Sequence, residues 1–120
     1  MLFRSILDRF TDSTLAYQGY GRGFDIDALR RINAFATGGL VPDLTLLIDI
    51  PAAVGLARAT ARSAGAADTI EREPLEFHER LRAGYLAVAE SEPRRFSVID
   101  GVAPTSEVSK KIWERVSQIF

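Results

Sequence analysis

Short continuous apolar runs alternate with amphipathic stretches along this chain, and the alternation predicts strands and helices in turn. Three runs have the character of buried strands: Ser5–Leu7, Leu44–Ile50 and Phe96–Ile99. The run Leu44–Ile50 (LTLLIDI) is the clearest, because it is rich in branched residues and lies between Pro42 and Pro51. Buried strands that alternate with helical segments indicate a parallel sheet of β-α-β units.

The segments between these runs have helical periodicity. One face is apolar in Ile26–Thr37, which Asp25 is suited to cap and Gly38 to end. The stretch Leu75–Ala89 carries an apolar stripe of Phe77, Leu81, Tyr85 and Val88. Further helices are expected over Ala52–Arg62 and over 106–120, the latter with Val108, Ile112, Val116 and Ile119 on its core side. The small residues of Ser63–Ala67 predict a mobile loop.

Composition narrows the class of protein. At 120 residues the chain fits one small domain, and its 47% apolar content is enough for a core. A net charge of −1 provides no basic surface for nucleic acid or an anionic membrane, and the lack of cysteine excludes disulfides and thiolate metal sites. No run has the length of a signal peptide or a membrane span. We therefore expect a cytoplasmic protein with no nucleic-acid or membrane partner.

Acidic residues follow the predicted strands at their carboxyl ends, where ligands bind in open parallel sheets. Asp8 and Asp100 end two of the runs, and Asp49 is the penultimate residue of the third. Asp8 can hold Mg²⁺, and the adjacent Arg9 can grip phosphate through two parallel hydrogen bonds. The alternative is ordinary structure, because Asp caps turns at strand ends and an adjacent Asp-Arg is more often an ion pair.

The next stretch offers groups suited to a nucleoside. If Thr11–Tyr20 is helical, Thr14 and Gln18 share a face, where a Gln amide matches the edge of a nucleobase. Tyr17 could close such a pocket against a sugar, although all three residues also fit an ordinary helix. The glycines that follow do not form a phosphate loop, because neither GxxxxGK[ST] nor GxGxxG occurs in the sequence.

Two arginines, Arg58 and Arg62, are four residues apart at the edge of the SAGAA loop. Arginines in such a place suit charge stabilisation in phosphoryl transfer, although a solvated helix face is the more usual explanation. The single histidine, His78, has no partner in the sequence, and we interpret it as structural or solvated.

Four ordered segments resemble one family. DRFTDSTLAYQGYGRG (8–23) resembles the DR[YFH]…ST.AYQG signature of thymidylate kinases. LTLLIDIPAAVGLARATAR resembles their fourth strand and the helix beside their lid. DTIEREPLEFHERLRAGYLAVAE resembles their DRIE…F..R.R.GYL segment, and FSVIDG their last strand and following loop. The resemblance covers essentially all of the chain.

The resemblance implies an α/β fold of the P-loop NTPase type with three layers, and transfer of a phosphoryl group from ATP with Mg²⁺ to dTMP, giving dTDP. It implies that Asp8 lies near the metal and phosphates and that Arg9 holds the dTMP phosphate. It further places Thr14 and Gln18 on the thymine and Tyr17 over the deoxyribose, where it disfavours a 2′-hydroxyl. Arg62 and Arg58 match lid arginines near ATP, and the backbone at Asp100 and Gly101 matches the adenine pocket.

Some features depart from the family. Thr69 stands where the DRIE motif has its arginine, Thr60 stands where some members carry another lid arginine, and the lid, about 58–72, is slightly long. The sequence also lacks the family's first strand, P-loop, second strand and phosphate-gripping FTREP-type segment. Residues 1–120 thus resemble a single partial domain, with the acceptor pocket and lid but without the donor cradle.

The resemblance also bears on the sheet. Family members have the strand order 2-3-1-4-5, and the strands here would be the third, fourth and fifth. We expect either a rearranged three-stranded sheet or completion by another chain, because unpaired buried backbone is costly. The kinase would then act only with a complete nucleotide site. The protein partner that we expect is a second copy in a homodimer or a complementing chain. The alternatives are a non-catalytic dTMP-binding or subunit-interaction remnant, and a truncated record of a full-length kinase.

Overall fold

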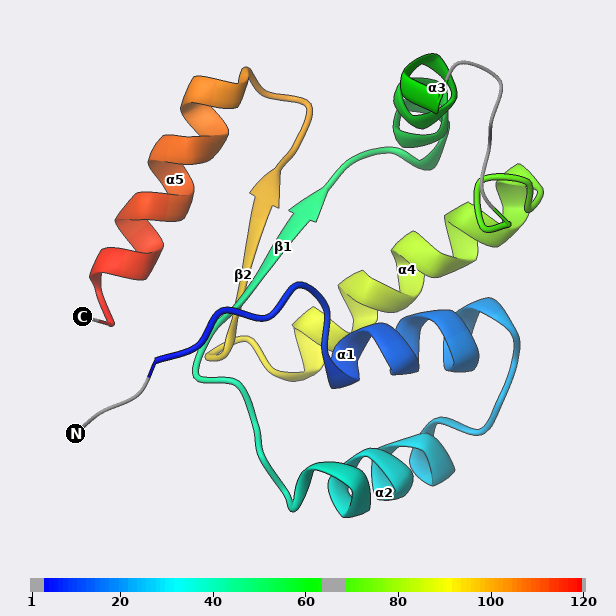
Figure 1. Ribbon diagram of the computed structural model, residues 1–120, viewed down its shortest axis with the longest axis vertical. Coiled ribbons are helices and arrows are strands. Elements are labelled where there is room, and N and C mark those ends of the chain that lie inside the picture. The colour runs from blue at the N-terminus through cyan, green and yellow to red at the C-terminus, as the bar shows by residue number, and fades with distance from the viewer. Residues whose placement is uncertain (1–3, 64–68, 120) are drawn as a thin grey trace.

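The computed structural model describes residues 4–63 and 69–119. The elements follow in the order α1 (Thr11–Thr14), a π-helix η1 (Leu15–Gly21), α2 (Ile26–Thr37), β1 (Thr45–Asp49), α3 (Ala52–Ser63), α4 (Leu75–Ser91), β2 (Phe96–Asp100) and α5 (Thr105–Ser117) (Figure 1). Within the described ranges no helix is both long and apolar enough to cross a bilayer. The α/β class and the helices expected from the sequence are confirmed, with small differences at their ends.

Strands β1 and β2 form a parallel pair, as the alternation of strands and helices predicts. Their register aligns Thr45 with Phe96 and Asp49 with Asp100. Both strands therefore end in a carboxylate at the same edge of the sheet. The α3 and α4 helices provide the crossover between them, and α5 packs against β2 (Figure 1).

The expected third strand is wrong. Ser5–Leu7 does not form a strand, and the Ile6 side chain is 100% exposed. In the part of the chain that the structure describes, the sheet has two strands, so the rearranged three-stranded sheet is wrong as well. An extended apolar segment becomes a strand only when it finds a backbone partner, and Ser5–Leu7 is not paired with β1. Completion by another chain stays a prediction.

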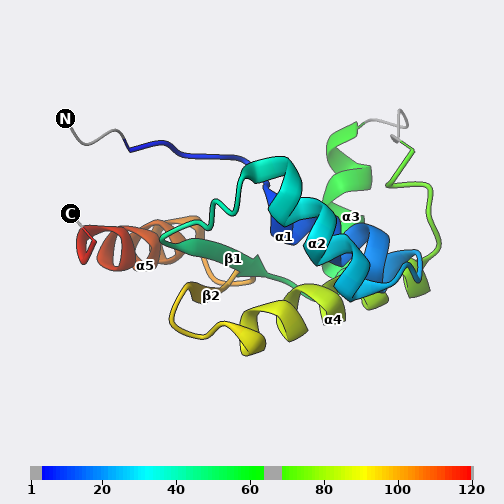
Figure 2. The ribbon, with the colours of Figure 1, turned by 90° about the horizontal axis from the view of Figure 1, so that it is seen from below.

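The core lies between the pocket helix, α1 with η1, and the helix α4. The pocket helix lies between α2 and α4 (Figure 2). One buried cluster joins Leu15, Val88, Ala89 and Phe96, and the other joins Ala16, Phe77 and Leu81. Of the predicted stripe on α4, Phe77, Leu81 and Val88 are buried and Tyr85 is half-buried. A Cβ on Gly84 would overlap the Tyr20 side chain, so glycine allows α4 to approach η1 closely.

The helix α2 has the bounds and the ends that its sequence predicts. The Asp25 carboxylate accepts a hydrogen bond from the Ala28 backbone N–H at 2.6 Å, which caps the helix. Gly38 ends it in the left-handed conformation, with φ of 64°. The expected core side of the C-terminal helix is only half-buried, at Val108, Ile112 and Val116 in α5 and at Ile119 just after it.

Candidate functional site

The first candidate cluster begins where the chain enters the pocket helix. Asp8 and Arg9 precede α1, Thr14 ends α1, and Tyr17 and Gln18 lie in η1. The sequence predicts a helix here, but nothing in it indicates that the backbone widens into a π-helix. Such insertions are rare and occur often at functional sites, where they change the direction of side chains.

Arg9 has an uncommon backbone conformation. Its φ of 67° makes it the only non-glycine residue with positive φ among those the structure describes. For an L-residue this conformation costs about 1–2 kcal/mol, and it persists where the surroundings impose it. It brings the Arg9 guanidinium to 5.3 Å from the centre of the Tyr17 ring. The structure therefore brings together two of the residues that the sequence singles out, while Asp8 beside them is exposed.

Tyr17 is held from the side of α4. Its ring lies 6.4 Å from the ring of Phe77 and 6.2 Å from that of Tyr85, the latter in an edge-on arrangement. The Tyr85 hydroxyl is 2.8 Å from the Ser13 hydroxyl. Burial raises the pKa of Tyr85, against the opposing effect of the Ser13 hydrogen bond, so its hydroxyl stays protonated at neutral pH. The sequence indicated Tyr85 only as part of an apolar stripe.

Thr14 and Gln18 are half-buried on the same helix. The backbone carbonyl of Gln18 accepts a hydrogen bond from the backbone N–H of Phe24 at 3.0 Å, which fixes the backbone after the pocket helix. Within residues 4–63 and 69–119, neither side chain has a hydrogen-bond partner. The amide of Gln18 is therefore available to a ligand, with both a donor and an acceptor.

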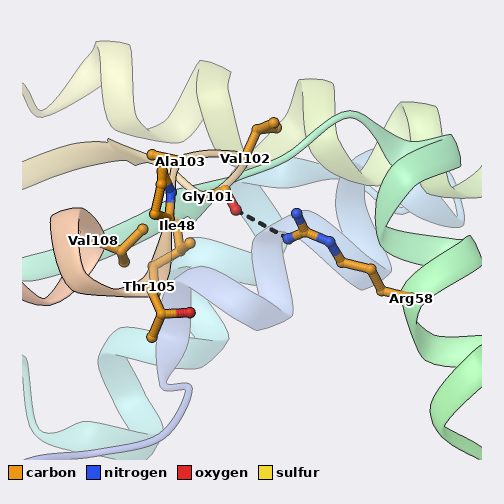
Figure 3. Close-up of a pocket in the computed structure, with 8 residues that line it drawn as sticks. Ile48, Arg58, Gly101, Val102, Ala103, Thr105 and Val108 are labelled. Atoms are coloured by element: carbon orange, nitrogen blue, oxygen red, sulfur yellow. Dashed lines mark hydrogen bonds between the residues drawn. The ribbon is translucent and has the colours of Figure 1, made fainter.

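A second cluster lines a cavity of about 510 Å³ at the carboxyl end of the sheet. Figure 3 shows Ile48, Val102 and Val108 around it, with Arg58 reaching in from α3. The Arg58 guanidinium donates to the Gly101 carbonyl at 3.0 Å. The Asp100 carboxylate accepts from the Val102 N–H at 2.9 Å, so it shapes the loop that begins the cavity wall.

The structure describes only the edges of the predicted lid, about 58–72. Arg62 is exposed in the last turn of α3, and the loop residues 64–68 of the predicted lid lie outside the described residues. On the far side, Glu73 accepts from the Arg22 guanidinium at 3.2 Å and links the lid edge to the turn after η1. Whether Arg62 reaches a phosphate stays a prediction.

One ion pair at the carboxyl end of β1 was not indicated by the sequence. The Arg82 guanidinium of α4 donates to both oxygens of Asp49, at 2.8 and 2.9 Å. These hydrogen bonds hold the pKa of the Asp49 carboxyl below its ordinary value, although partial burial opposes the shift. Arg82 thereby neutralises one of the two carboxylates that the strand register places side by side.

The Asp49 pair gives stability that depends on pH. Because the pKa of this carboxyl is lowered on folding, its contribution is present above the unfolded pKa and is lost as the pH falls through the folded pKa. We expect Asp49→Asn to destabilise the chain at neutral pH, and the difference from the parent to shrink between about pH 5 and about pH 2. Urea unfolding across this range measures it, with Asp43→Asn, at an exposed position, as the control. A difference that is constant with pH would contradict the assignment.

The described residues contain no cluster of three His, Cys, Asp or Glu side chains fit for a metal ion. Magnesium at phosphate sites needs fewer protein ligands, because it is held by one or two carboxylates together with phosphate oxygens and water. Asp8, an exposed carboxylate next to Arg9 in the sequence, has the chemistry for such a site.

The comparisons with known proteins agree with one another. The family model described as thymidylate kinase matches residues 3–112. A thymidylate kinase of Solidesulfovibrio magneticus is 50% identical over 120 residues, which cover 96% of this chain and 57% of the relative. A thymidylate kinase of Desulfovibrio desulfuricans is 56% identical over 108 residues, which cover 86% of this chain and 50% of the relative. The chain thus spans about half the length of the curated relatives it matches.

Proposed function

Because this chain belongs to the thymidylate kinase family, we propose that it forms the dTMP-binding part of a site that transfers a phosphoryl group from ATP to dTMP. The observation that carries this proposal is the arrangement at the start of the pocket helix. There Arg9 is held in an uncommon conformation over Tyr17, and the amide of Gln18 is left without a partner in the described chain.

Each side chain has a role that its chemistry supports. Gln18 and Thr14 would hold the edge of the thymine, and Tyr17, fixed by Tyr85, would form the wall against the deoxyribose. Arg9 would bind the dTMP phosphate through its guanidinium. Together these contacts orient the acceptor oxygen, and orientation supplies a large part of catalysis in phosphoryl transfer.

The donor side is proposed at the cavity beside Arg58. There the loop at Asp100 and Gly101 would line the adenine pocket, and Arg62 would approach the transferring phosphate. Asp8 would contribute one carboxylate to Mg²⁺, which supplies charge neutralisation for the phosphates when bound. The sequence has no GxxxxGK[ST] motif to cradle those phosphates, so we propose that ATP binds productively only when another polypeptide segment completes the site.

The edge of the sheet offers a place where such a segment could bind. In the described structure β1 is paired along one edge, by β2, and its Ile48 side chain is 50% exposed. A free edge with exposed apolar side chains is a template for another strand. A complementing chain or the second copy in a homodimer would cover this edge, but only a complementing chain would bring a phosphate-cradle motif.

Titration with dTMP followed by calorimetry tests the acceptor site. We expect saturable binding by the chain, weakened about tenfold or more in Gln18→Ala, because the thymine then loses a hydrogen-bonded partner. Gln118→Ala is the matched control, since Gln118 is an exposed glutamine after α5. Binding that is unchanged in Gln18→Ala would show that thymine is not held there.

The second candidate is a non-catalytic dTMP-binding or subunit-interaction module. The missing phosphate-cradle motif favours it, because a pocket can retain affinity without the donor cradle. Turnover on addition of a P-loop-containing chain supports the kinase. Affinity for dTMP without turnover in that mixture supports the dTMP-binding module. No binding at millimolar dTMP contradicts both the kinase and the dTMP-binding module, and leaves the subunit-interaction module.

A further inference from the structure

A buried ion pair joins the pocket helix to the start of the second strand. The Arg95 guanidinium donates to both oxygens of Asp12, and each of these bonds is 2.8 Å long. Asp12 lies in α1 and is 6% exposed, whereas Arg95 immediately precedes β2. Eighty-three positions separate the two residues in the sequence. No motif or pattern in the sequence indicates a role for either residue.

Further contacts fix Arg95 in place. Its guanidinium also donates to the Thr45 hydroxyl at 2.7 Å, at the first residue of β1, and to the Glu92 carboxylate. The central carbon of the guanidinium lies over the ring of Phe96, 4.5 Å from the ring centre. The Arg95 side chain is only 11% exposed. One cation therefore binds the pocket helix and the amino ends of both strands at a single point.

This point is linked to both halves of the candidate site. Asp12 lies in the first turn of the helical segment that carries Tyr17, and Arg9 lies three residues before it in the chain, so a shift of Asp12 displaces both. The strand that follows Arg95 ends at Asp100, and the next residue, Gly101, accepts a hydrogen bond from Arg58 in the wall of the cavity. The strand β2 thus spans from the pocket helix at one end to the cavity at the other.

We infer that Arg95 is a positioning residue of the acceptor site, which acts through Asp12 to hold the pocket helix in register with the two strands. This inference rests on the proposed function. A misplacement of about 1 Å in a substrate-orienting group is enough to reduce activity strongly. A bidentate guanidinium–carboxylate pair is suited to this role, because its two parallel hydrogen bonds fix direction as well as distance.

The competing explanation is that Arg95 only stabilises the fold. If Arg95 only stabilises the fold, its loss should speed opening across the whole domain. If it is a positioning residue, its loss should speed opening of the pocket helix. Arg95→Gln removes the charge, and Arg95→Lys keeps it but loses the two parallel bonds. Arg94→Gln is the matched control, because Arg94 is the exposed neighbour.

Amide hydrogen exchange of the ligand-free chain separates the two roles. We expect exchange in Leu15–Gly21 to be about tenfold faster in Arg95→Gln than in Arg94→Gln, with exchange in β1 and β2 unchanged. The exchange rate of Arg95→Lys in this segment should lie between those two. If Arg95→Gln does not fold, Arg95→Lys is compared with Arg94→Gln instead. Equal rates in the Arg95 variants and Arg94→Gln, or uniform acceleration over Leu15–Gly21, α4 and both strands, would overturn the inference.

Calorimetry with dTMP gives a second readout, at a temperature where all variants are folded. The dissociation constant should rise about tenfold in Arg95→Gln and stay unchanged in Arg94→Gln. An unchanged constant in Arg95→Gln would overturn the inference. If the parent chain does not bind dTMP, the proposed function fails, and the exchange rates in Leu15–Gly21 still decide whether Arg95 positions the helix.

Discussion

The purified chain, mixed with ATP, Mg²⁺ and dTMP, is expected to produce no dTDP above the background without protein. Catalysis of phosphoryl transfer consists almost entirely of positioning and charge stabilisation around the phosphates. The acceptor groups Arg9, Tyr17 and Gln18 are present, but the sequence has no P-loop lysine or amide cradle for the donor. Chromatographic separation of dTMP and dTDP measures the result directly.

The thymidylate kinase of Desulfovibrio desulfuricans provides the positive control for this assay. Any trace of turnover should be compared with Arg9→Ala, because contaminating kinase is insensitive to that change. Robust turnover by the chain that disappears in Arg9→Ala would contradict the proposal that a second segment is required.

Replacement of Phe77 by alanine is expected to cost about 3–5 kcal/mol of unfolding free energy, enough to unfold many small domains. Phe77 is 2% exposed at the centre of the core between α4 and the pocket helix. Its ring contacts Tyr17 and lies so close to Gly21 that a Cβ there would approach it to 2.9 Å. The pocket helix would therefore lose packing along with the core. Denaturant unfolding followed by circular dichroism measures the loss.

The matched control is Phe35→Ala on α2, where the side chain is 92% exposed. Removing an exposed ring should change the unfolding free energy by no more than about 0.5 kcal/mol. Equal losses for the two phenylalanines would contradict the assignment of the core to the contact between α4 and η1.

Local chemistry was enough to predict several elements. The helix α2 has the bounds predicted from its apolar face, because Asp25 and Gly38 satisfy the backbone at its two ends. The strands β1 and β2 followed from short branched runs, and their parallel pairing followed from the helices between them. Ser5–Leu7 has the same local character, but its state depends on a backbone partner, which its own residues do not encode.

The candidate site was predicted less completely. The sequence singled out Arg9 and Tyr17, but neither the positive φ of Arg9 nor the π-helix has a signal in residue types. The pairs Asp12 with Arg95 and Asp49 with Arg82 join residues far apart in the chain, so only the fold brings them together. The resemblance to thymidylate kinases supplied the roles, which the residues alone left open.

Amide hydrogen exchange of the chain, with and without saturating dTMP, tests most directly the claim that the start of the chain forms an acceptor pocket. We expect slower exchange in peptides that cover 8–22, because Arg9, Tyr17 and Gln18 lie there, and unchanged exchange in α2. Protection that is absent from 8–22, or that appears only in other elements, would contradict it.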